Sequence, residues 1–472
     1  MSHPPDLLDL LVLGAGPSGL AYAMGALEGA SAGGRYLHLK VLEAQGRPGG
    51  WVHTRKVGGY SLETGPYGYL DKHPELGRMV ETLGLSRLQR EPMPAARSRF
   101  VLARGKLRPL PRGPLSFLFS RILGLGAKLR LLGEPWAAPA PGTDESVAAF
   151  ANRRLGPEAA EALVVPMFTG IYAGDPDKAS LAACFPRMAE LEKSYGGLFR
   201  ALWRLRKQVR ASGQGVGAPR GVLTSFEGGL STLMERLAGH LGQDRLRLDT
   251  PALSVSREAD GFRVETRDGS FRAKRLVVAT PAQVAASLLT SIEPRLGNIL
   301  GSIPYAGVAV VHTAYGPNSA SMVPKGFGFL VPRRAKRELL GAVFVSTIFP
   351  EHAPKSELLL RNVLGGALRP DLIGLEDAEL IRRVRAEHRE LLGIEDEPRF
   401  VDLMRYPASL PQYHVGHLDR LAALTSALAQ IPGLRVTGNA LRGIGLADCL
   451  AQNFRGGLED YGALPDRGTA LD

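Results

Sequence analysis

The fold class is decided by one stretch near the N-terminus, Leu10-Leu11-Val12-Leu13-Gly14-Ala15-Gly16-Pro17-Ser18-Gly19-Leu20. Its apolar half predicts a buried parallel strand. The three glycines that follow allow a tight turn and a close backbone approach to a pyrophosphate at the N-terminus of a helix. Pro17 suits the start of that helix, because proline lacks an amide that the first turn leaves unpaired. The pattern predicts a Rossmann-type dinucleotide-binding unit in an α/β fold.

A second strand is predicted over residues 37–42, and it ends at Glu43-Ala44. A carboxylate at that position can accept hydrogen bonds from both ribose hydroxyls and would repel a 2′-phosphate, which argues against NADP. The spacing from Gly19 to Glu43 exceeds the usual figure of about 20 residues. We expect a loop insertion around residues 31–34 to account for the excess.

The segment Arg47-Pro48-Gly49-Gly50-Trp51 points to a flavin rather than to NAD. An arginine and two glycines directly after the second strand can bring a cation and bare backbone against the diphosphate of FAD. Only one complete Gly-x-Gly-x-x-Gly motif is present, so no second domain for NADH or NADPH is predicted. Oxygen, a quinone or another acceptor would then have to reoxidise the reduced flavin.

Composition narrows the class of protein. The 472 residues predict two or more domains. The net charge of +12 either favours an anionic partner or reflects general use of arginine, and no interleaving of aromatic with basic residues points to nucleic acid. Two cysteines are too few for a disulfide framework, and neither a secretory leader nor an apolar run of 18 residues is recognisable, so we expect a cytosolic protein. His414 and His417 lack further ligands, and no metal site is expected.

The order of strand and helix signals predicts that the cofactor domain is split. A helix-rich segment follows residue 75, and strand signals return at residues 246–248, 262–266 and 275–281, at 303–365, and at 434–438 before a glycine loop and a helix. The segment 115–123 is unusually apolar for a surface. Residues 198–210 combine large apolar side chains with five cations, namely Arg200, Arg204, Arg206, Lys207 and Arg210. A basic amphipathic helix can lie in a lipid interface, but a helix that faces a core looks the same.

Five further motifs occur in order along the chain. They are Gly170-Ile171-Tyr172-Ala173-Gly174-Asp175; Ser180-Leu181 with Phe185-Pro186; Phe327-Gly328-Phe329-Leu330-Val331-Pro332; Pro411-Gln412-Tyr413 with Gly416-His417; and Gly443-Ile444-Gly445-Leu446-Ala447-Asp448-Cys449. Together with the FAD signature, they make nearly the whole chain resemble the oxygen-dependent protoporphyrinogen oxidases, which belong to the flavin amine oxidase superfamily.

This resemblance implies a split Rossmann-type FAD-binding domain, a mixed-sheet substrate domain and an inserted helical membrane-binding domain. The parts would be residues 1–87, 222–290 and 406–472 for FAD, 88–210 for the helical insertion, and 291–405 for substrate. The implied activity is the FAD-dependent six-electron oxidation of protoporphyrinogen IX to protoporphyrin IX with oxygen, a late step of haem biosynthesis. The implied location is cytoplasmic, peripheral on the inner face of the cell membrane, with an anionic lipid surface as partner; a homodimer stays open.

The resemblance also implies the site residues. FAD, bound non-covalently, would contact Gly14, Ala15, Gly16, Pro17, Ser18, Gly19, Glu43, Ala44, Arg47, Gly50, Trp51, Gly65, Pro66, Tyr67, Gly68, Ala252, Ile444, Gly445 and Leu446. The substrate would contact Arg99, Gly170, Phe327, Gly328 and Leu330, with Arg99 facing a propionate. No side chain is assigned as a catalytic acid or base, because the flavin performs the hydride transfer.

Two departures from the family pattern leave alternatives open. The chain has Gly65-Pro66-Tyr67-Gly68-Tyr69 where relatives often have Gly-Pro-Asn-Ser-Phe, and Ala447 where they have asparagine. A pocket with changed polarity is compatible with a repurposed, non-catalytic flavoprotein that binds a tetrapyrrole. Arg97 beside Arg99 is compatible with coproporphyrinogen III, which carries four propionates and would yield coproporphyrin III. A polyamine oxidase or a desaturase is a further alternative.

Overall fold

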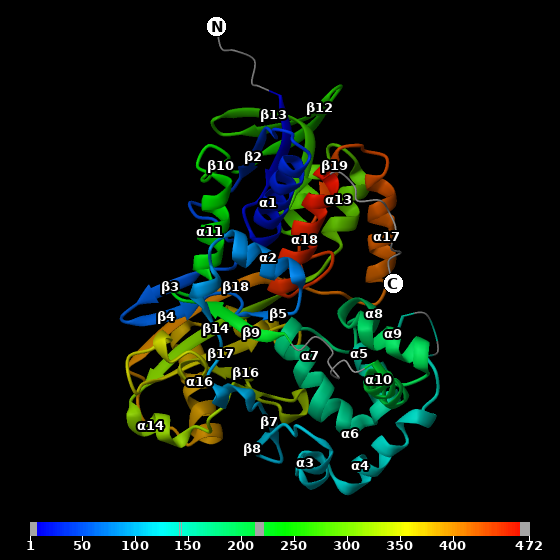
Figure 1. The fold of residues 1–472 in the computed structure, drawn as a ribbon. Coiled ribbons are helices and arrows are strands. Elements are labelled where there is room, and N and C mark those ends of the chain that lie inside the picture. Colours follow the sequence, from blue (N-terminus) through cyan, green and yellow to red (C-terminus); the bar gives the residue numbers. More distant parts are fainter. Residues whose placement is uncertain (1–6, 141, 143, 213–220, 463–472) are drawn as a thin grey trace.

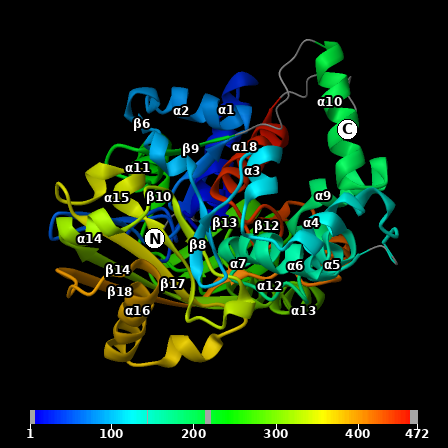
Figure 2. The same ribbon diagram turned by 90° about the horizontal axis from the view of Figure 1, so that it is seen from below.

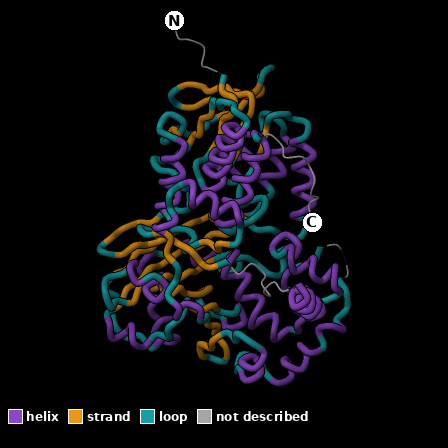
Figure 3. Tube along the Cα trace, viewed as in Figure 1, coloured by secondary structure: helices purple, strands orange, loops and turns teal. Residues whose placement is uncertain are grey.

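The computed structural model describes residues 7–140, 142, 144–212 and 221–462 (Figures 1 and 3). Two seven-stranded sheets form the main body. In Figure 1 the first sheet lies in the upper half with its helices, the second lies at the lower left, and a group of helices lies at the lower right. The chain is therefore α/β with a mixed second sheet, as predicted.

The first sheet is built from distant parts of the chain. Strands β1 (Leu8–Leu13), β2 (Leu39–Leu42) and β10 (Leu246–Arg247) pair in parallel, and β13 (Gly269–Val278) joins β1 to β19 (Leu434–Val436), also in parallel. β12 (Gly261–Thr266) and β11 (Ser254–Glu258) continue the sheet antiparallel to β13. The predicted splitting of the cofactor domain is confirmed by this topology.

Three helices cover one face of this sheet, namely α1 (Pro17–Ala32), α11 (Ser231–Leu241) and α18 (Leu446–Tyr461). Glycines allow α1 and α18 to approach closely. A Cβ at Gly25 would overlap the carbonyl oxygen of Phe454, so the two helix backbones are in direct contact there. The close packing places the N-termini of α1 and α18 at the edge where the strands of the first sheet end (Figure 1).

The second sheet is mixed and mainly antiparallel. Its strand order is β18 (Phe400–Pro411), β14 (Tyr305–Tyr315), β17 (Leu358–Gly365), β16 (Leu339–Phe344), β15 (Gly328–Leu330), β7 (Phe100–Ala103) and β8 (Lys106–Pro109). The β15 and β7 pair is parallel. Helices α14 (Pro317–Met322) and α16 (Asp377–Leu392) cover one face. The opposite face contacts the segments of Trp51 and Gly65 through Tyr406 and Arg361.

The helical insertion is shorter than we expected. Residues 100–109 form β7 and β8 of the second sheet rather than helix: the backbone of β7 pairs with β15, and β8 pairs with β7. The helices begin with α3 (Pro114–Phe119) and α4 (Leu125–Leu132) and continue through α5 (Val147–Leu155), α7 (Val165–Tyr172), α9 (Pro186–Tyr195) and α10 (Leu198–Ser212). Figure 2 shows α10 projecting from the body of the molecule.

Two expected domain boundaries are also displaced. Helix α13 (Pro294–Gly301) packs into the core beside the first sheet through Leu296 and Leu300, so the cofactor domain extends beyond residue 290. Strand β18 runs without a break across residues 405 and 406, so the second sheet ends at Pro411. The boundary expected after residue 290 falls in the turn between α12 (Ala282–Leu289) and α13, which share one core cluster, whereas the boundary expected after residue 405 falls inside a single strand.

Candidate functional site: an FAD cradle beside an apolar sheet face

The glycine turn after β1 forms an open cradle at the start of α1. Gly14 has a φ of 100°, and a Cβ there would lie 2.9 Å from the carbonyl oxygen of Ala279. A Cβ at Gly19 would overlap the carbonyl oxygen of Gly14. Gly16 is the N-cap of α1 and, because glycine has no side chain, it does not cap the helix; a Cβ at this position would meet nothing within 4 Å. The first turn of α1 carries no acidic residue, so the helix N-terminus suits a diphosphate.

Glu43 stands at the end of β2, as predicted for a ribose-binding carboxylate. It is buried, and it accepts hydrogen bonds from the backbone N–H of Ala15 (2.7 Å) and of Gln45 (2.9 Å). The N–H of Thr250 donates to the Glu43 carbonyl at 2.8 Å, which brings the segment of Ala252 to the same edge. Two amide donors fix the carboxylate, and its remaining lone pairs can accept ribose hydroxyls.

The Arg47 to Trp51 loop lies directly on the glycine turn. The N–H of Gly49 donates to the carbonyl of Ala15 at 2.7 Å, and a Cβ on Gly50, which has a φ of 54°, would lie 3.4 Å from the Gly16 Cα. The Trp51 ring meets the Tyr406 ring edge-on, with centroids 5.4 Å apart. The loop therefore joins the cradle to strand β18 of the second sheet.

The segment 65–68 can offer mainly its backbone. The Gly65 carbonyl accepts a hydrogen bond from Arg361 Nη2 at 2.9 Å. The Tyr67 side chain is buried, with its hydroxyl 3.3 Å from His352 Nδ1 and its ring beside Phe349. The tyrosine that departs from the family pattern thus fills a core cluster.

The turn before α18 brings the C-terminal segment to the same region. Gly445 is the N-cap of α18, and Ile444 packs against a cluster that contains Tyr172 and Tyr413. Cys449 is buried, its Sγ lies 3.1 Å from the Gly443 carbonyl, and burial raises the pKa of the thiol to about 12. Because the thiolate is the nucleophile, this thiol is unsuited to a covalent flavin bond. Acid or heat should therefore release all of the flavin, and flavin that stays on the denatured chain would contradict this prediction.

The predicted substrate residues fall into two contacting groups. A Cβ on Gly170, in α7, would lie 2.6 Å from Leu330 Cδ2 in β15. The Arg99 guanidinium lies over the Phe327 ring, 5.1 Å from its centroid, and Arg99 is exposed. None of the ion pairs formed by the described residues involves Arg99. The carboxylates within the described ranges therefore leave this cation available.

Strand pairing places these residues on one face of the second sheet. Gly328 in β15 is opposite Val343, which is opposite Arg361, and Leu330 is opposite Gly341, which is opposite Val363. Residues that pair directly share a face. The face continues through Val310 and Met404, and at Val308 and Val310 it packs against Ala173, which ends α7. Leu330, Val343, Val363 and Tyr406 on it are only partly buried.

Sequence analysis missed two residues of this face, Arg361 and Tyr406. A signal for Arg361 is visible, because it is a lone arginine in the apolar strand Leu358-Leu359-Leu360-Arg361-Asn362-Val363-Leu364. Only strand register shows that it faces the cofactor segment.

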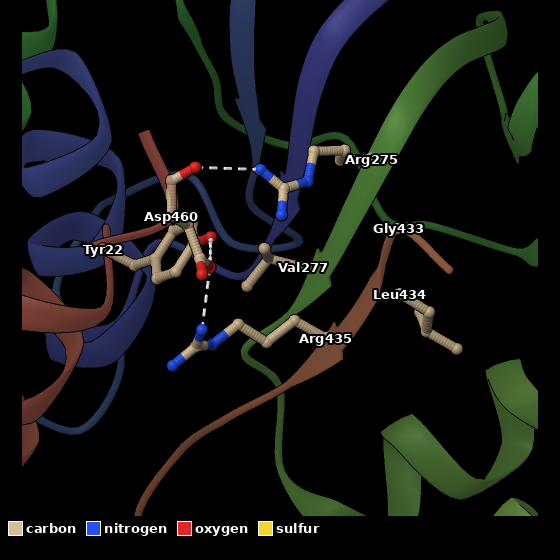
Figure 4. A pocket seen from close by; sticks show the side chains of 7 residues that line it. All are labelled: Tyr22, Arg275, Val277, Gly433, Leu434, Arg435 and Asp460. Carbon is tan, nitrogen blue, oxygen red and sulfur yellow. Dashed lines mark hydrogen bonds and ion pairs between the residues drawn. The ribbon is translucent and has the colours of Figure 1, made fainter. Parts of the chain in front are cut away.

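One pocket of about 200 Å³ lies elsewhere, between α1, α18, β13 and β19 (Figure 4). Its polar groups bind one another: Asp460 accepts hydrogen bonds from Tyr22 (2.5 Å) and Arg435 (2.7 Å), and its carbonyl accepts one from Arg275 (3.1 Å). None of the predicted cofactor or substrate residues lines it. These contacts tie the end of α18 to the sheet, and we do not assign the pocket to the site.

Among the residues that the structure describes, no group of three His, Cys, Asp or Glu side chains could hold a metal ion. His417 stacks on Tyr413 with centroids 4.4 Å apart, and its Nε2 lies 3.0 Å from the Leu441 carbonyl oxygen. This histidine has the structural role that we expected.

The cradle and the apolar face define an FAD-dependent oxidoreductase. The profile of the flavin containing amine oxidoreductases matches residues 18–451, and the chain belongs to this family. It is 32% identical to the chloroplastic protoporphyrinogen oxidase of Nicotiana tabacum, over 98% of this chain and 87% of that protein. It is 30% identical to the coproporphyrinogen III oxidase of Bacillus subtilis, over 94% of this chain and 96% of that protein. A crystal structure provisionally assigned as a protoporphyrinogen oxidase, from Exiguobacterium sp. 255-15, superposes with a TM-score of 0.81 at 28% identity, over 97% of this chain and 99% of that one.

Proposed function

We propose that this protein oxidises protoporphyrinogen IX to protoporphyrin IX with bound FAD and molecular oxygen. One observation carries the proposal: the FAD cradle adjoins a partly exposed apolar sheet face in a chain that is 32% identical, over 98% of its length, to a protoporphyrinogen oxidase. A porphyrinogen is a large apolar macrocycle with carboxylates only on its propionate arms. An apolar face with a free cation at its border matches that chemistry.

The chain's residues bind and orient, while the cofactor carries the redox chemistry. The redox chemistry that bound FAD would supply is the removal of a hydride from a bridge carbon of the macrocycle, three times in all, with loss of pyrrole protons. The start of α1 and Glu43 hold the diphosphate and the ribose. The side chains of Leu330, Val343 and Val363, on the apolar face of the second sheet, hold the macrocycle, and Arg99 holds a propionate.

The decisive experiment is an assay of flavin-loaded protein under air. Porphyrin fluorescence should rise with protoporphyrinogen IX, with three molecules of oxygen consumed per porphyrin formed. Coproporphyrinogen III, tested in parallel, should react more slowly. A protein that holds FAD but forms no porphyrin and consumes no oxygen with either substrate would refute the proposal and point to the non-catalytic alternative. Faster turnover of coproporphyrinogen would refute the substrate assignment alone.

We further propose that the helical insertion binds an anionic membrane surface. Large apolar side chains are more than half exposed on α3, α4, α10 and the turn Glu134–Trp136: Leu115, Leu118, Phe119, Leu125, Leu129, Leu132, Trp136 and Trp203. The turn contacts both α4 and α10. Helices α3, α4 and α10 all lie in the lower right part of the molecule in Figure 1. Such patches are unusual on monomeric soluble proteins.

Charge on α10 supports this proposal. Arg200, Arg204 and Lys207 are exposed on the helix, while the side chains of Arg206 and Arg210 lie outside the described set. Buried Glu134 accepts hydrogen bonds from the N–H groups of Leu198 (2.8 Å) and Phe199 (3.0 Å), which fixes the start of the helix. None of the helices in the described ranges has the length and apolar character that a membrane crossing requires. We therefore propose that the protein lies peripherally on the inner face of the cell membrane.

Whether the protein forms a homodimer is a separate question, which gel filtration coupled to light scattering will test.

Phe119→Ser should weaken binding to anionic vesicles about tenfold, because part of the roughly 1.5 to 3 kcal/mol of burying a large apolar side chain is lost. Phe119 is 80% exposed, so folding should not change. High salt should weaken binding further, since each juxtamembrane cation contributes about 1 kcal/mol. Sedimentation with vesicles measures both effects. Met322→Ser, at an exposed position on α14, is the matched control. Equal sedimentation of the two variants would contradict the prediction.

A further inference from the structure

A row of polar side chains crosses three strands of the second sheet. Register places His312 of β14 opposite Arg361 of β17 and opposite Asp402 of β18. The row lies on the same face as Val343 and Gly328, and therefore on the face of the candidate site.

Arg361 carries a charge that no described carboxylate neutralises directly. Its Nη2 donates to the Gly65 carbonyl at 2.9 Å, its Nε is buried without an acceptor, and it takes part in none of the ion pairs among the described residues. The nearby Arg55 differs from Arg361, because its charge is neutralised by an ion pair with Asp402 at 3.0 Å. Burial lowers the pKa of Arg361, but a guanidinium stays protonated in proteins.

The groups that face Arg361 do not cancel this charge at low pH. Glu63 is buried, accepts hydrogen bonds from Thr54 Oγ1 (3.0 Å) and from the Leu230 N–H (2.9 Å), and burial raises its pKa to about 7. His312 is fully buried with both ring nitrogens unpartnered, and burial keeps its pKa well below 6.5, so it is neutral. The remaining neighbours are the neutral phenols of Tyr67 and Tyr406. A partly buried charge without a counter-ion is costly, which suggests that a ligand balances it.

We propose that Arg361 is a positioning residue for FAD: it holds the Gly65–Gly68 segment against the cofactor, and its positive charge favours the reduced, electron-rich state. The proposal rests on the proposed function only in taking that segment as a cofactor contact. A fixed cation in a poorly solvated site stabilises added negative charge more strongly than water does. Glu63, once ionised, opposes the effect.

The first test measures the midpoint potential of bound FAD in the absence of porphyrinogen. In Arg361→Met the reduced cofactor should bind about tenfold to hundredfold less tightly relative to the oxidised one, which lowers the potential by about 30 to 60 mV for a two-electron couple. Arg361→Lys, which keeps the charge, should lose less than half of that shift. Arg382→Met, an exposed charge change on α16 beyond the other face of the sheet, should leave the potential unchanged.

The second test uses Glu63→Gln and needs no change at Arg361. Because burial raises the pKa of Glu63 to about 7, most of this side chain is protonated at pH 6, and the potentials of wild type and variant should differ less there than at pH 8. At pH 8 the wild-type carboxylate is ionised beside Arg361, so the variant should have the higher potential. If Arg361→Met fails to fold or to hold FAD, Arg361→Gln replaces it: glutamine keeps an N–H donor for the Gly65 carbonyl but carries no charge, so the potential should fall by a similar amount.

Each failure is distinguishable. Unshifted potentials in all variants of an active enzyme would overturn this inference alone. Shifted potentials in a protein that oxidises no porphyrinogen would overturn the proposed function alone. A raised KM for porphyrinogen without a change in potential would show that Arg361 serves a substrate carboxylate, which also overturns the inference.

Discussion

Gly16→Asp is expected to abolish FAD binding without disturbing the fold. Gly16 is the N-cap of α1 with a φ of −73°, which any residue can adopt, and a Cβ there would meet nothing within 4 Å. The new carboxylate would point into the cradle that holds the diphosphate. Two like charges about 4 Å apart at an effective dielectric constant of about 20 repel by about 4 kcal/mol, or about 1,000-fold in dissociation constant.

The measurement is a fluorescence titration of apoprotein with FAD, together with the flavin content after purification. Gly16→Asn has the same shape without the charge and should weaken binding by less than tenfold. Unfolding must be compared between apoproteins, because a bound ligand stabilises the folded state of whichever protein retains it. An aspartate variant that holds one FAD per chain with a dissociation constant near that of wild type would show that the diphosphate lies elsewhere.

Arg99→Ala should lower kcat/KM for protoporphyrinogen by roughly 10-fold to 150-fold. The guanidinium is exposed, lies over the Phe327 ring at 5.1 Å, and forms no ion pair among the described residues, so it can bind a propionate through two charge-assisted bonds. Hydrogen bonds to charged groups contribute about 1.5 to 3 kcal/mol. The loss should appear mainly in KM, because the propionate is remote from the reacting carbon and is held alike in ground and transition states.

Steady-state kinetics on flavin-loaded protein test this prediction. Arg99→Lys should recover only part of the loss, since an ammonium cannot reproduce the planar fork. Arg97→Ala is the matched control: this arginine is also exposed two residues away, and its loss should matter for a substrate with four carboxylates rather than two. Kinetic constants of Arg99→Ala within twofold of wild type would remove the residue from the site, and lost flavin would mean that it supports the fold.

The sequence alone was sufficient for the FAD cradle and the class of fold. The strand, the glycine turn and α1 lie within 25 consecutive residues, and Glu43 follows a second apolar strand, so local patterns determine how these parts meet. The split of the cofactor domain was also predictable, because the apolar end of β13, Leu276-Val277-Val278, is followed by Ala-Thr-Pro, and β19 is followed by a glycine loop. Domain boundaries were less accurate where an element such as β18 continued across them.

The tertiary structure decided which distant side chains share the site. Leu330, Val363 and Val310 are brought together by register across β15, β16, β17 and β14, and a shift of one residue would turn each to the opposite face. The same pairing places Arg361 behind the carbonyl of Gly65, 296 residues earlier in the chain. Local sequence specifies whether a segment becomes a strand and which residues alternate, but not which strand it pairs with, because that choice depends on the packing of the whole core. This is why local patterns were sufficient for the cradle, whereas Arg99 was assigned only through the family resemblance and Arg361 and Tyr406 were missed.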